Sequence, residues 1–125
     1  MAATQTKVHF QPAHGLDMRA TRTIAEDEHP AKRWPEVIRV VTLYVDTEGY
    51  AAAFVCFRPP AHGGHVDLVR CYRGRIGPAE QVGDPLAAVG GFEALADQVE
   101  DRFAAKLAMF LGQPGGSEPD TWHAQ

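Results

Sequence analysis

Apolar residues concentrate in the middle of the chain, in runs separated by short polar or glycine-rich segments. Residues 36–46 (EVIRVVTLYVD) and 49–58 (GYAAAFVCFR) are rich in β-branched and aromatic side chains, which favour strands. The polar turn at 46–49 (DTEG) between them predicts a hairpin. A third strand is expected over residues 65–73 (HVDLVRCYR), after the loop at 59–64 (PPAHGG). These segments together predict an antiparallel meander.

Two weaker strands are expected before this meander. Residues 6–10 alternate polar and apolar side chains, and Pro12 is expected to interrupt the pattern soon afterwards. Residues 17–26 form a weakly amphipathic segment rich in threonine and charge, which suits an edge strand. The polar run at 26–30 (EDEHP) is expected to end it.

The C-terminal part of the chain has a helical pattern instead. Between residues 92 and 111, apolar side chains recur every three or four positions, which predicts one amphipathic helix of about five turns. Asp84 and Pro85 are the residue types preferred at the N-cap and first position of a helix. Gly90-Gly91 is expected to separate this short first turn from the main helix, and Gly112 to end the main helix.

The pattern as a whole predicts an α+β fold in one domain over residues 1–112. We expect a four- or five-stranded, mostly antiparallel meander sheet with the C-terminal amphipathic helix packed on one face. Residues 113–125 are rich in proline and glycine and are expected to form a flexible tail. A chain of 125 residues buries enough surface to fold around one core without a metal or a disulfide.

The predicted sheet is apolar on both faces. With Val45 paired near Tyr50, one face carries Val37, Val41, Leu43, Val45, Ala52, Phe54 and Cys56, and the other carries Ile38, Val40, Tyr44, Ala53, Val55 and Phe57. One helix covers only one face, so the second face needs another cover. A homodimer through the second apolar sheet face is the simplest solution, and the N-terminal segment folded over an edge is the alternative.

Composition narrows the class of partner. Twelve Lys and Arg against sixteen Asp and Glu give a net charge of −4, which makes nucleic acid an unfavoured main partner. No apolar window approaches the roughly 18 residues needed to span a bilayer, and the first residues lack the apolar stretch of a signal peptide. We therefore expect a cytoplasmic protein with no membrane partner. In the cytoplasm, two cysteines without a CxxC spacing are usually reduced, so we expect Cys56 and Cys71 to be reduced core residues.

Two groups of side chains are candidates for a ligand site. An aromatic pocket between sheet and helix is predicted to hold a small apolar ligand, although core packing explains the same residues; it would be lined by Tyr44, Tyr50, Phe57 and Tyr72. Arg70 and Arg73, in the segment 70–75 (RCYRGR), are suited to a phosphate, a carboxylate or an unstacked base. The alternative for these arginines is ion pairing with the acidic helix residues Glu93, Asp97 and Asp101.

The remaining motifs point away from catalysis. His62 and His65 lie three residues apart but lack the further ligands that close a zinc site, so we expect a solvated turn and no metal. The chain contains no P-loop, GxGxxG, HExxH or nucleophile-elbow motif, and it calls for no cofactor. The sequence thus favours a small cytoplasmic binding or accessory protein, expected to be a homodimer, over an enzyme. The alternatives are a small-molecule binder or cofactor-independent enzyme with the aromatic pocket, taking an apolar or anionic ligand, and nucleic-acid binding through residues 70–75.

Overall fold

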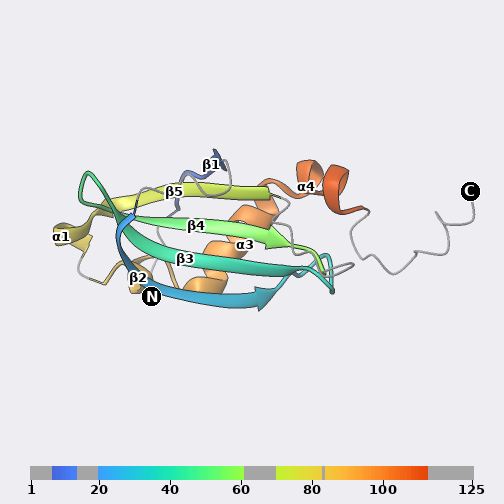
Figure 1. Cartoon of the computed structure of the whole chain (residues 1–125), viewed down its shortest axis with the longest axis horizontal. Coiled ribbons are helices and arrows are strands. Elements are labelled where there is room, and N and C mark those ends of the chain that lie inside the picture. The colour runs from blue at the N-terminus through green and yellow to red at the C-terminus, as the bar shows by residue number, and fades with distance from the viewer. Residues whose placement is uncertain (1–6, 14–19, 61–69, 83, 113–125) are drawn as a thin grey trace, which may run out of the picture.

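The computed structural model describes residues 7–13, 20–60, 70–82 and 84–112. Its centre is one five-stranded sheet in which every pair of neighbouring strands is antiparallel, with the spatial order β1-β5-β4-β3-β2 (Figure 1). The strands are β1 (Gln11–Ala13), β2 (Ala20–Pro30), β3 (Ile38–Asp46), β4 (Tyr50–Arg58) and β5 (Arg70–Pro78). Strands β2 to β5 are consecutive neighbours, so the predicted meander is confirmed, as is the α+β class.

The helices follow the sheet: α1 (Ala79–Val82), α2 (Pro85–Ala88), α3 (Phe92–Arg102) and α4 (Ala104–Leu111). The longest, α3, packs across β2, β3 and β4 on one face of the sheet (Figure 1). As predicted, Asp84 caps α2, its carboxylate accepting hydrogen bonds from the N–H groups of Leu86 and Ala87. The prediction of one helix over 92–111 is wrong, because the backbone bends at Phe103, whose ring stacks on Tyr72 at 4.2 Å between centroids.

The strand boundaries differ from the sequence pattern at both sheet edges. The first strand is not 6–10 but Gln11–Ala13, and it includes Pro12, which an edge strand tolerates because one side of it makes no ladder hydrogen bonds. Strand β2 is the other edge, as expected, but it continues through the acidic run to Pro30. Strand β5 continues to Pro78. The predicted strand residues 65–69, the histidine pair at 62 and 65, and the tail at 113–125 lie outside the described residues.

The hairpin between β3 and β4 has the predicted turn but a different register. Gly49, with a φ of 84°, donates its N–H to the Asp46 carbonyl at 3.0 Å, which closes the turn. Val45 pairs with Ala51, one residue further along β4 than the Tyr50 pairing from which the two faces were predicted. A shift of one residue exchanges the two faces of a strand, so the predicted grouping of β4 with β3 was wrong. Val41 and Leu43 therefore share the α3 side with Ala51, Ala53, Val55 and Phe57.

Both faces of the sheet are apolar and both are buried at their centre. The larger cluster lies between sheet and helices and includes Phe10, Trp34, Leu43, Val55, Phe57, Tyr72, Leu95, Val99 and Leu107. The second cluster lies on the opposite face and consists of Tyr44, Ala52, Phe54, Cys56 and Cys71. None of these five residues is more than 6% exposed in a single chain. The centre of the second face is thus buried without a second copy, and the homodimer stays a prediction.

Cys56 and Cys71 form a disulfide between β4 and β5. They are directly opposite one another in the strand register, with their Cα atoms 4.1 Å apart. The expectation of two reduced core thiols is therefore wrong. The reason is the pairing of two strands, which brings together residues 15 positions apart that share no motif in the sequence.

The acidic side of α3 holds the loop between β2 and β3. Arg39, which is 1% exposed, places its Nη1 2.7 Å from Asp97 Oδ1 and 3.2 Å from Glu100 Oε1. The fully buried Glu100 carboxylate also accepts the backbone N–H groups of Lys32, at 3.1 Å, and Arg33, at 2.7 Å. A buried carboxylate needs such partners, because desolvation of an unpaired charge is costly.

Candidate functional site

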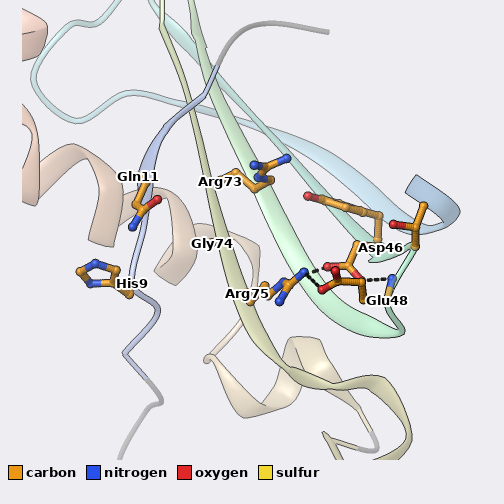
Figure 2. A pocket seen from close by; sticks show the side chains of 9 residues that line it. His9, Gln11, Asp46, Glu48, Arg73, Gly74 and Arg75 are labelled. Carbon is orange, nitrogen blue, oxygen red and sulfur yellow. Dashed lines mark hydrogen bonds and ion pairs between the residues drawn. The ribbon is translucent and has the colours of Figure 1, made fainter. Parts of the chain in front are cut away.

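An open pocket of about 630 Å³ lies beside the turn that joins β3 to β4 (Figure 2). Its wall carries mostly polar side chains and comes from three parts of the chain that are far apart in the sequence: residues 9–11 at the start of β1, the end of β3 with the turn that follows it, and β5. The lining residues are His9, Gln11, Tyr44, Asp46, Thr47, Glu48, Arg73, Gly74 and Arg75. The pairing of Gln11 with Arg73 puts β1 and β5 side by side along one wall.

The space between these large side chains exists because β4 is small here. Ala52 pairs with Tyr44 on one side and with Arg75 on the other, so it lies between them on the same face of the sheet. Its methyl group is fully buried and cannot fill the gap that the tyrosine and the arginine leave above it. Ala52 is the only alanine of the run at 51–53 on this face, and its small side chain leaves room between Tyr44 and Arg75.

Asp46 organises the turn end of the pocket. Its Oδ1 accepts the backbone N–H groups of Glu48, at 2.8 Å, and Tyr50, at 3.0 Å, and its Oδ2 accepts Arg75 Nε at 2.9 Å. Burial disfavours the charge of Asp46, but these hydrogen bonds and the charge of Arg75 outweigh it and hold the pKa of this carboxyl below its ordinary value. Arg75 also pairs with the Glu48 carboxylate and lies over the Tyr50 ring, with 4.4 Å to the centroid.

Arg73 and Tyr44 form the other end of the pocket. Burial raises the pKa of the Tyr44 phenol, while the charge of Arg73 and a hydrogen bond to it act in the opposite direction. Tyr44 is only 1% exposed, so its ring belongs to the second apolar cluster. In Figure 2, the Arg73 side chain lies at a distance from the group formed by Arg75, Asp46 and Glu48.

Gly74 lets the N-terminal segment lie close to β5. A Cβ atom at this position would be 2.5 Å from Val8 Cγ1 and 3.1 Å from the carbonyl oxygen of His9. The segment is held from the other side by α3, because the Val8 N–H donates to Gln98 Oε1 at 2.9 Å. A larger residue at position 74 would thus displace the segment that brings His9 and Gln11 to the pocket.

Comparison with known proteins assigns no family to this arrangement. No family model, curated protein or solved structure matches the chain. Within the described ranges, no three His, Cys, Asp or Glu side chains are grouped so that they could hold a metal ion. None of the helices in those ranges has the length and apolar character needed to cross a bilayer.

The four aromatic residues predicted to share one pocket lie on two sides of the sheet. Tyr44 lines the pocket described here, and Tyr50 lies beneath Arg75 on the same face. Phe57 and Tyr72 are on the α3 side, where their rings meet edge to face at 6.3 Å and both are buried in the larger cluster. The strand alternation that separates them means that they do not line one cavity between sheet and helix.

The arginines of β5 are divided in the same way. Arg73 and Arg75 line the pocket, whereas Arg70 is paired with Phe57 in the register and lies over the Phe110 ring, with 3.8 Å to the centroid. Among the described ion pairs, the acidic side of α3 binds Lys32, Arg33 and Arg39 instead of these strand arginines. Residues 70–75 therefore do not form one cationic strip for a nucleic acid.

His9, Gln11 and the two turn carboxylates are pocket residues that the sequence did not suggest. Tyr44 and Arg73 could be named from their residue types alone, because aromatic and guanidinium groups are common in ligand sites. Gln11 reaches the pocket only through the pairing of β1 with β5, and no local pattern signals that pairing. The turn DTEG indicated a hairpin but not that its carboxylates would bind an arginine of a third strand.

Proposed function

We propose that this protein binds a small anionic molecule, one with a carboxylate or phosphate group, in the pocket between the β3–β4 turn and β5. The observation that carries this proposal is the position of Arg73 in the wall of an open pocket, opposite Gln11 and beside the Tyr44 hydroxyl. A guanidinium has five N–H donors and can hold a phenol oxygen and an oxyanion at the same time. Its fork matches the two oxygens of a carboxylate or phosphate.

The pocket supports this role by its size and by the arrangement of its charges. A volume of about 630 Å³ falls within the range of small-molecule sites. The two acidic residues at the turn, Asp46 and Glu48, are both bound to Arg75, which offsets their repulsion of an anion. The ligand oxyanion is therefore expected at the Arg73 end, where His9 and Gln11 add further polar groups to the wall.

The proposal is tested by titrating the isotope-labelled protein with inorganic phosphate and with succinate, followed by amide and side-chain NMR signals. We expect saturable shifts at Gln11 and Arg73, and an affinity at least about tenfold lower in Arg73→Gln, since charge-assisted hydrogen bonds contribute about 1.5–3 kcal/mol. Arg22→Gln is the matched control, because Arg22 is an exposed arginine on the far edge strand β2. Linear shifts spread over many surface residues, or equal affinity in the Arg73 variant, would contradict the proposal.

The expected partner and location remain predictions. Light scattering at micromolar concentration tests the homodimer, and a monomer would reject it. The disulfide does not favour the expected cytoplasmic location, because disulfides persist mainly in oxidising compartments.

A further inference from the structure

Helix α4 is apolar on nearly every side. Its inner face is packed in the core, with Leu107 fully buried and Ala108 and Leu111 against it. Its outward face consists of Ala105, Lys106, Met109 and Phe110, which are all exposed. A helix on the surface of a protein normally presents polar residues to water, and one that is apolar all round has a partner.

The outward face of α4 contains most of the large apolar surface exposed by the described residues. Met109 is 73% exposed and Phe110 45%, and among the residues that the structure describes the only other exposed large hydrophobic is Ile24, at 37%, on strand β2. This exposure is not due to a loose helix end. The Gly112 N–H donates to the Ala108 carbonyl at 2.9 Å, and Trp34 Nε1 donates to the Gly112 carbonyl at 3.0 Å.

Cations border this apolar surface. The Arg70 guanidinium lies over the Phe110 ring, with 3.8 Å from its central carbon to the ring centroid, and Lys106 is one helical turn before Phe110. Neither cation is ion-paired with a carboxylate among the described residues, and α4 itself contains no acidic residue. The local charge is thus positive on a protein whose net charge is −4.

A second copy of the chain fits this surface poorly. Two large apolar side chains on an eight-residue helix are well short of the about 800 Å² that each partner buries in a stable complex. Pairing the face with itself would also bring Arg70 and Lys106 close to their own copies, and like charges across an interface are unfavourable. A lipid surface needs neither a large area nor a matching shape, and anionic headgroups complement both cations.

We propose that the outward face of α4 docks the protein reversibly on an anionic phospholipid bilayer. Helix α4 lies beyond the end of the strands (Figure 1), where it can meet a flat surface. Met109 and Phe110 enter the boundary between headgroups and acyl chains, while Lys106 and Arg70 remain at the level of the lipid phosphates. The helix lies on the bilayer and does not span it, and this docking is independent of the ligand pocket.

The test is co-sedimentation of the full chain with vesicles made of equal parts phosphatidylcholine and phosphatidylglycerol, and with vesicles of phosphatidylcholine alone. We expect binding to the anionic vesicles only, and a decrease in binding as salt is added. Absence of binding to the anionic vesicles at low salt would overturn the proposal. A dimer detected by light scattering and abolished by Phe110→Ser would also overturn it, because a second copy would then be the occupant.

Substitutions on α4 test whether this helix is responsible for the binding. Met109→Ser combined with Phe110→Ser should lower the partition coefficient roughly tenfold through the lost apolar burial. Lys106→Gln, which keeps both apolar side chains, should lower it about fivefold, the expected effect of one cation near the surface. Ile24→Ser is the matched control and should bind as the wild type does. Binding that survives in the double variant would show that another surface is responsible and would reject the assignment.

Discussion

Breaking the Cys56–Cys71 disulfide should make the protein markedly less stable. The bond joins residues 15 positions apart, so it restricts a loop of that length in the unfolded chain. In the chain-entropy account, closing such a loop stabilises the folded state by about 3 kcal/mol at 25 °C. For a domain of this size, a loss of that magnitude lowers the midpoint of thermal unfolding by about 10 °C.

The assay is thermal and urea unfolding followed by circular dichroism, with and without a phosphine reductant. The wild type should lose stability in the reductant, and the double variant Cys56→Ala with Cys71→Ala should unfold near the reduced wild type. Alanine suits these sites because both cysteines are buried in an apolar cluster and no new polar group is introduced. The reductant should leave the double variant unchanged, which controls for effects unrelated to the bond.

Two results would refute this reasoning. Equal unfolding midpoints for the wild type with and without reductant, at full reduction, would mean that the loop-closure account does not apply to these strands. Alkylation of both cysteines in denaturant without any reductant would mean that the bond is absent from the purified protein.

Three further predictions concern the fold and the pocket. Glu100→Gln should cost about 3 kcal/mol or more in urea unfolding, because it leaves a buried arginine underpaired, whereas Glu93→Gln on the exposed side of α3 should stay within about 0.5 kcal/mol. Gly74→Ala should cost about 1–3 kcal/mol through its clash with Val8 and the backbone beside it, and an unchanged urea midpoint would argue against that close approach. Since the folded-state pKa of Asp46 is depressed, the wild type should lose stability as the pH falls below about 4 toward that pKa, and urea midpoints of Asp46→Asn should vary less over the same range.

The kinds of element could be predicted from the sequence, but their register could not. Alternation identifies which face a residue occupies only when one face is polar, and β3 and β4 are apolar on both. Val45 could therefore be paired with Tyr50 or Ala51 on pattern alone, and the structure selects Ala51. The sequence also does not predict the break between α3 and α4 at Phe103. The apolar spacing continues through this position, and the bend accompanies the stacking of Phe103 on Tyr72.

For the candidate site, too, the residue types could be predicted from the sequence, but their positions in the fold could not. Arg73 and Tyr44 were named as ligand residues for their chemistry, and the structure brings them together. Phe57 and Tyr72 were grouped with them wrongly, since sheet alternation puts those rings in the core. The sequence does not single out Arg39, an isolated cation in an apolar strand, because its two carboxylate partners lie on a helix far along the chain.

The place of β1 at the edge of the sheet has a consequence for the order of folding. Strands β2 to β5 can form through successive pairings of neighbours in the sequence. The pairing of Gln11 with Arg73 instead closes a loop that contains all the residues between them, and closing such a long loop costs chain entropy. The strand has only three residues, so little ladder energy holds it once formed. The pocket, which needs this segment, is therefore expected to form late in folding and to be lost early in unfolding. Amide hydrogen exchange at Gln11 and Ala13 should accordingly outpace exchange in the centre of β3 and β4.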